Sequence, residues 1–288
     1  MPTFDTPEPI AATIEVGVGD VRIAASDRPD TVVEVRPSDP GADLDVRAAG
    51  QTRVEYAGGQ LLVKAPRRAL GLFGKPGSID VTIALPTGSQ VRGTAEVAAF
   101  HGTGSLGECW IKTSTGDIQL ERTGPLDLST ASGTIAVGVV AGPARASSGG
   151  GVVRISEIDG DAVIKNSNGD SRIGTVRGNL TIKAANGDIT VGFAGADLNA
   201  ASSNGDVRIG EITRGSVSVK SANGELEVGI PAGTPAYLDL HTAFGSMHNR
   251  LDTAGPPPEG EDTVSVRART SYGDIVIRRP ATGTGEHL

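Results

Sequence analysis

Apolar and polar residues alternate on both sides of a glycine that returns about every 18 residues over most of the chain. After Gly187, for example, Ile189 and Val191 are apolar, and Ile182 stands five residues before it. Strict alternation is typical of half-buried β-strands and not of helices. Each repeat is therefore predicted to be a strand, a turn and a second strand. The turn glycines are Gly116, Gly133, Gly151, Gly169, Gly187, Gly205, Gly224, Gly245 and Gly273.

Four of these turns are Asn-Gly pairs followed by an acidic residue. Asn-Gly is also the usual hairpin signal, so an antiparallel meander or barrel competes with a solenoid. A meander of this length would leave an apolar sheet face without a cover, since no segment shows a helical pattern. In a β-solenoid with one repeat per coil, each repeat stacks on an equivalent repeat and the apolar face is buried between the strands of the coil. We favour this all-β fold. Its corners would use Asn and Gly because both tolerate left-handed backbone angles. The predicted corner residues are Asn168, Gly169, Asn186, Gly187, Asn204, Gly205, Asn223 and Gly224.

Five segments are expected along the chain. Residues 1–95 contain strands of irregular spacing, LDVRA among them, and would form an N-terminal β-rich cap. Residues 96–254 are the solenoid repeats and 255–262 a proline-rich loop. Residues 263–280 would be the final coil that closes the solenoid, and 281–288 a frayed tail.

Three stretches resemble a known family. These are the repeated S-x-N-G-D-[IV]-x-[VI], the segment SIDVTIALPTGS at 78–89, and RTSYGDIVIRR at 269–279. They are similar to the bacterial putative-adhesin family of β-strand-repeat proteins, a domain of unknown function, and most similar in style to its actinobacterial members. The resemblance implies a β-solenoid with an adhesin-like or scaffold role. It transfers no catalytic residues.

Charge and cysteine content exclude several classes of protein. The net charge of -8 with no basic block argues against nucleic-acid binding. Cys109 is the only cysteine, so neither a disulfide framework nor a thiolate zinc site can form within one chain. No apolar run is long enough to span a membrane and no signal peptide is evident, so we expect a cytoplasmic protein unless a leader was trimmed. No cofactor is expected.

Charged residues recur beside the turn. Stacked carboxylates one residue after the glycine could bind a divalent cation, but solvated turn residues bonded to local amides are the better interpretation, and no metal site is predicted. They are Asp117, Asp170, Asp188, Asp206, Glu225 and Asp274. Outward-facing basic residues could form an interaction strip beside this corner, although such ladders also serve solubility. The predicted strip is Lys112, Arg154, Lys165, Arg172, Lys183, Arg208 and Lys220.

A non-catalytic scaffold that binds a protein partner along a sheet face or at a solenoid end is the favoured function. A glycan-binding module is the alternative, with Trp110 as the candidate aromatic platform on the coils. An enzyme active on polysaccharides ranks below both; its site would lie in the irregular coil with His241 and His248. Cys109 falls on an inward position and is expected to be a buried apolar side chain. The protein is expected to be a monomer or a weak end-to-end homodimer, with Arg278, Arg279 and Pro280 protecting the last edge.

Overall fold

The computed structural model describes residues 1–66, 77–251 and 263–280. The chain forms two compact units, Met1–Gly150 (unit 1) and Gly151–Leu288 (unit 2), and each is described by itself. The expected proline-rich loop and tail fall on residues 252–262 and 281–288, which lie outside the described residues. Within the described ranges, no helix has the length and apolar character needed to cross a membrane.

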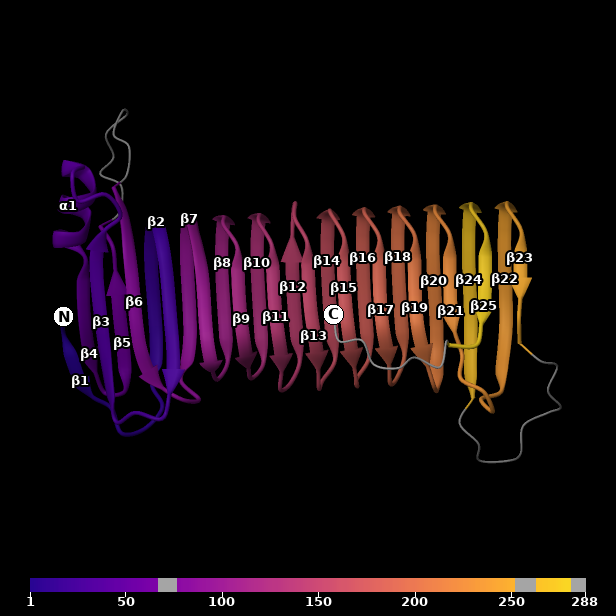
Figure 1. Cartoon of the computed structure of the whole chain (residues 1–288), viewed down its shortest axis with the longest axis horizontal. Helices are drawn as coiled ribbons and strands as arrows, with labels where there is room; N and C mark the ends of the chain where they lie inside the picture. Colours follow the sequence, from indigo (N-terminus) through magenta and orange to yellow (C-terminus); the bar gives the residue numbers. More distant parts are fainter. Residues whose placement is uncertain (67–76, 252–262, 281–288) are drawn as a thin grey trace. The chain divides into compact units, whose positions relative to one another are not determined.

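Unit 1 contains an N-terminal region followed by regular coils (Figure 1). Its elements are β1 (Thr3–Asp5), β2 (Ala11–Ser26), β3 (Asp30–Pro37), α1 (Asp43–Gln51), β4 (Arg53–Ala57), β5 (Gln60–Lys64), β6 (Ser78–Pro86), β7 (Gln90–Ser105), β8 (Cys109–Thr115), β9 (Ile118–Thr123), β10 (Leu126–Ser132), β11 (Ile135–Val140) and β12 (Ala144–Ser148). The long strand β2 pairs in parallel with β7 on one side and with β5 and β6 on the other. Antiparallel β3 then covers β6, and β1 covers β3.

The expected strand at LDVRA is wrong, because these residues belong to helix α1. Asp43 and Asp45 occupy its first turn, where the positive end of the helix dipole favours carboxylates. Asp45 also accepts hydrogen bonds from the backbone N–H groups of Asp39 and Ser78, which ties the helix to its surroundings. Leu, Arg and Ala are good helix formers, so local propensity agrees with the observed helix.

Unit 2 is built from two-strand coils. Its elements are β13 (Val153–Ile158), β14 (Ala162–Asn168), β15 (Ser171–Val176), β16 (Leu180–Asn186), β17 (Ile189–Ala194), β18 (Leu198–Asn204), β19 (Val207–Ile212), β20 (Gly215–Asn223), β21 (Leu226–Gly229), β22 (Ala236–Phe244), β23 (Met247–Asn249), β24 (Val264–Tyr272) and β25 (Ile275–Arg278). The strands before the corners pair in parallel with one another as a first sheet, and those after the corners form a second sheet.

This pairing confirms the β-solenoid. The strands that flank Asn186-Gly187 would pair antiparallel in a meander, but β16 pairs in parallel with β14 and β18, while β17 pairs with β15 and β19. The register repeats one coil at a time, so that Ile182 lies beside Ile164 and Ala200. Inward residues of the two sheets, such as Ile182 and Ile189, are fully buried. The outward residues of the two sheets therefore point to opposite faces of each coil.

The corner glycines are required by the stacking of coils. Gly187 has a φ of 132°, and a Cβ atom placed on it would lie 2.3 Å from the backbone oxygen of Gly169 in the preceding coil. The expectation that asparagine also adopts a left-handed conformation is wrong: in the described part of the chain, only glycines have positive φ. The close approach of one corner to the next therefore selects glycine, and asparagine has a different role, described below.

The order of the last coils differs from the order in the sequence. Strand β24 lies between β20 and β22, and β25 lies between β21 and β23, as Figure 1 also shows. The prediction that 263–280 closes the solenoid is therefore wrong; β22 and β23 form the end coil. The reason lies in the patterns, because β24 has apolar residues at its inward positions, and these are buried between neighbouring strands on both of its edges. In β22 the inward side chains are only half-buried, and in β23 they are exposed.

Candidate functional site

Basic side chains gather on the outer face of the first sheet of unit 2. Lys165 of β14 lies beside Lys183 of β16, and Lys220 of β20 lies beside Arg269 of β24. Ala201 fills the one position between Lys183 and Lys220. We call the set Lys165, Lys183, Lys220, Arg267 and Arg269 the lysine face.

Within the described residues, the lysines of this face have no carboxylate partner. Among the described residues, no ion pair involves Lys165, Lys183 or Lys220, and all three are exposed. With neighbouring coils about 4.8 Å apart, the row from Lys165 to Arg269 is about 19 Å long. Its positive charge stands out against the net charge of -8 of the chain.

In the part of the chain that the structure describes, Asp239 supplies the carboxylate at the end of the lysine face. It lies 3.0 Å from the Nε atom of Arg267 and 3.3 Å from an Nη atom of Arg269. The hydrogen bonds from Arg267 and Arg269 lower the pKa of Asp239 below its ordinary value. These two arginines are therefore partly neutralised, whereas the lysines are not.

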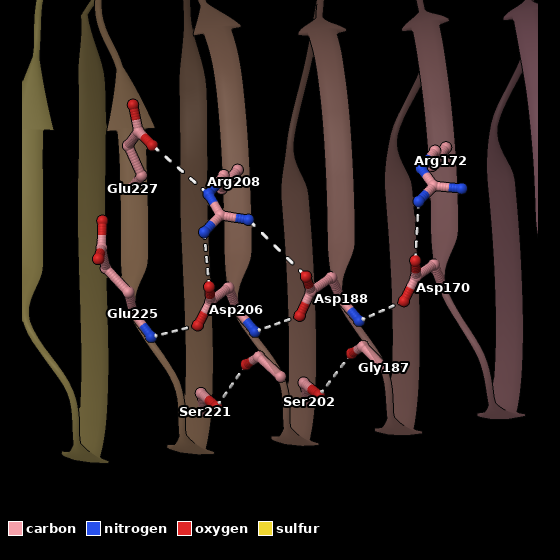
Figure 2. Close-up of polar contacts among 11 residues, drawn as sticks. Asp170, Arg172, Gly187, Asp188, Ser202, Asp206, Arg208, Ser221, Glu225 and Glu227 are labelled. Atoms are coloured by element: carbon pink, nitrogen blue, oxygen red, sulfur yellow. Dashed lines mark hydrogen bonds and ion pairs between the residues drawn. The ribbon is translucent and has the colours of Figure 1, made fainter.

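The arginines of the predicted strip lie on the opposite face. Arg154 and Arg172 are neighbours on the second sheet, and Arg172 pairs with Asp170 at 2.8 Å. Arg208 lies 2.5 Å from Asp206 and 3.8 Å from Asp188, as Figure 2 shows. The strip predicted from the sequence is thus two separate rows, of which the second is largely paired. Lys112 belongs to β8 of unit 1, beside Thr94 and Ser129.

The acidic corner residues bind backbone groups of the next coil. Asp170 accepts a hydrogen bond from the N–H of Asp188 at 3.1 Å, and Asp188 accepts one from Asp206 at 2.9 Å (Figure 2). Asp206 accepts one in turn from the N–H of Glu225 at 2.8 Å. From the sequence alone, each carboxylate is expected to bond amides of its own turn. The amides that it bonds belong instead to the neighbouring coil. In the part of the chain that the structure describes, no cluster of His, Cys, Asp or Glu is arranged to hold a metal ion.

The corner asparagines form an amide ladder. The Nδ2 atom of each donates to the Oδ1 of the preceding one at 2.9 Å, from Asn186 to Asn168, from Asn204 to Asn186, and from Asn223 to Asn204. In the next two coils, Tyr272 and Phe244 continue this row, and their rings stack with centroids 4.9 Å apart. Asparagine is thus favoured at the corner because its side-chain amide can both donate and accept a hydrogen bond along this ladder.

The residues that the sequence analysis singled out for catalysis or glycan binding do not come together in one site. His241 is on the first sheet and His248 on the second, so their outward side chains lie on opposite faces of the end coil. Burial, followed by the charge of Glu108, raises the pKa of the Cys109 thiol to about 12. Trp110 is half-buried and covered by the guanidinium of Arg92, 4.7 Å from its ring centroid. Trp110 is therefore not the open platform that the sequence suggested.

A search of curated proteins gives no match. Solved structures similar to the chain include a putative adhesin from Parabacteroides distasonis ATCC 8503, with 16% identity, a TM-score of 0.36 and coverage of 96% of this chain and 95% of that one. A putative adhesin from Parabacteroides merdae ATCC 43184 has 13% identity, a TM-score of 0.35 and coverage of 96% and 94%. A family model described as Toastrack DUF4097 matches residues 12–278, and the chain therefore belongs to that family.

Proposed function

We propose that the protein is a non-catalytic, adhesin-like interaction module whose lysine face binds an acidic segment of a protein partner. The observation that carries the proposal is the row of exposed lysines without carboxylate partners among the described residues, while Arg172 and Arg208 of the opposite face are paired. Unpaired cations attract an anionic partner, and the sheet that carries them is a regular backbone that needs little reordering on binding. We also propose that the chain is an actinobacterial-type member of its family, because it carries the repeated S-x-N-G-D-[IV]-x-[VI] pattern.

A protein partner is favoured over a glycan by the chemistry of this face. Sugars bind well to exposed aromatic rings, yet the outward positions of β14, β16, β18 and β20 carry no aromatic residue. Beside the lysines stand Val163, Thr181, Asn199 and Ser218, which are small and suit a flat contact. An extended peptide with several Glu or Asp residues fits such a row.

Binding of an oligoglutamate peptide of about 20 residues, measured by fluorescence anisotropy, tests the proposal. Replacing both Lys183 and Lys220 by Gln is expected to weaken binding about tenfold, which corresponds to about 1.4 kcal/mol for the two contacts. Raising the salt concentration should weaken binding of the wild type more than that of the variant. Lys112→Gln is the matched control, since Lys112 occupies the same strand position in unit 1 beside uncharged neighbours.

Two results would count against the proposal. Equal affinity of the double variant and the wild type would show that the lysine face is not the binding surface. Tighter binding of an acidic glycan such as alginate, with the same loss in the double variant, would favour the glycan-binding alternative. A partner from the native host supports the proposal only if its acidic segment competes with the peptide.

A further inference from the structure

As far as the structure describes the chain, the end coil of unit 2 has a free strand edge. Among the described residues, β22 pairs only with β24, and β23 pairs only with β25. In unit 1, by contrast, the first coil strand β2 is covered by β6, and β6 is covered by antiparallel β3. A free edge presents unpaired N–H and C=O groups that another strand can pair with.

The same coil exposes side chains that other coils bury. Met247 occupies the inward position that Leu226 and Ile275 fill in the neighbouring coils; Met247 is 55% exposed, whereas those two are fully buried. Leu238 and Leu240 are likewise half-buried at positions where other coils have buried aliphatic residues. No described residue therefore covers the apolar layer between the two sheets at this end.

This edge lacks the features that usually prevent strand addition. The sequence of β22, AYLDLHTAF, contains no proline or lysine. Its single carboxylate, on Asp239, is held by Arg267 and Arg269. Phe244 is 66% exposed, with one ring face stacked on Tyr272 and the other directed beyond the end coil.

We propose that this end is a docking surface for a second copy of the chain, related by a two-fold axis parallel to the strands. Such an axis places β22 of one copy antiparallel beside β23 of the other, so each edge gains a partner. It also brings the two corners together, and Phe244 stacks on Phe244 of the second copy. The row of stacked corner residues is then continuous through the interface.

The size of the surface indicates a weak dimer. A nine-residue strand at about 3.3 Å per residue, in sheets about 10 Å apart, offers an end of roughly 30 by 20 Å, or about 600 Å² per copy. Two copies would bury about 1,200 Å², the lower limit of stable interfaces, so dissociation at micromolar concentration is expected. The proposal does not depend on the lysine face, which stays exposed in the dimer.

Sedimentation equilibrium of the full chain from about 1 to about 300 μM tests the proposal. The wild type should pass from monomer to dimer, and Phe244→Lys should raise the dissociation constant at least tenfold. Tyr237→Lys is the matched control, because Tyr237 is an aromatic residue of the same strand, 61% exposed, at the end far from the corner. Circular dichroism and melting temperature confirm that each variant is folded. A wild type that remains monomeric, or a Phe244→Lys variant that dimerises like the wild type, would overturn the proposal.

Oxidative crosslinking tests the arrangement itself. Phe244→Cys should give a disulfide-linked dimer on mild oxidation with copper phenanthroline, and Tyr237→Cys should not. The native Cys109 does not interfere because it is fully buried. Dimerisation of the wild type without crosslinking of Phe244→Cys would refute the two-fold arrangement. Loss of peptide binding at the lysine face would leave this result unchanged, so the two proposals fail independently.

Discussion

Replacing Gly187 by alanine tests whether the stacking of corners dictates the repeat. The added methyl group would lie 2.3 Å from the backbone oxygen of Gly169, and the φ of 132° is one that alanine rarely adopts. The backbone conformation alone costs about 1–3 kcal/mol. Displacement of the corner also weakens the hydrogen bonds from the N–H of Gly187 to Asn204 and from Ser202 to the oxygen of Gly187, at about 1 kcal/mol each.

These contributions predict a loss of about 3–5 kcal/mol in the free energy of unfolding. Urea unfolding followed by circular dichroism should show a midpoint lower by about 1–1.7 M, for a slope of about 3 kcal/mol per M. Because coils of a solenoid need not unfold together, hydrogen exchange of residues near the corner should be measured as well. Exchange is expected to accelerate first in β16 and β17 (Leu180–Asn186 and Ile189–Ala194).

Gly17→Ala is the control for this variant. Gly17 lies in β2, has no positive φ, and its added methyl group would meet no atom within 4 Å. Its replacement should leave stability unchanged or raise it by up to about 1 kcal/mol through the unfolded state. A loss of less than about 1 kcal/mol for Gly187→Ala would refute the steric explanation of the corner glycines.

Two further predictions concern titratable groups. Replacing Arg267 and Arg269 by Gln should raise the pKa of Asp239 toward its ordinary value, as measured by NMR titration of the carboxyl carbon. Since the folded pKa is the lower one, the stabilisation from this cluster is present above the unfolded pKa and is lost as the pH falls through the folded value; an unchanged pKa in the double variant would contradict the assignment. Cys109, with its pKa raised to about 12, should not react with a thiol reagent at about pH 8 until the protein is unfolded, and rapid labelling of the folded protein would show that the burial is wrong.

The coil architecture could be predicted from the sequence because one pattern is repeated. Residues such as Ile182 and Val191 alternate with polar ones at a constant distance from a glycine, and parallel stacking alone buries every apolar position. The outward direction of Lys183 and Arg208 follows from the same parity. Their location on opposite faces also follows once the two strands are assigned to two sheets, a step that the single-strip prediction omitted.

The end of the solenoid could not be read in the same way. Sequence order suggested that 263–280 forms the last coil. The strand with the more apolar inward face, however, gains more free energy from an inner position, where a coil lies on each side of it. Val264, Val266 and Ala268 of β24 are buried between β20 and β22, at a place where Leu238 and Leu240 of β22 would otherwise lie. The 28-residue spacing from Gly245 to Gly273 and the loss of aliphatic residues after Gly245 were the available signals. Helix α1 gave a weaker signal, since its nine residues are too short for a clear period.

The repeat itself explains why the candidate surfaces lie where the pattern changes. In the inner coils, the corner groups are satisfied by the equivalent groups of the next coil, as in the hydrogen bonds between Asn186 and Asn204 and between Asp188 and Asp206. Groups satisfied in this way have little capacity left for a ligand. The lysines have no carboxylate partner in the described chain, and the end coil has no further coil beside it. Among the described residues, these two places retain charge without an ion-pair partner and backbone without a strand partner, which is why the two proposals place binding there.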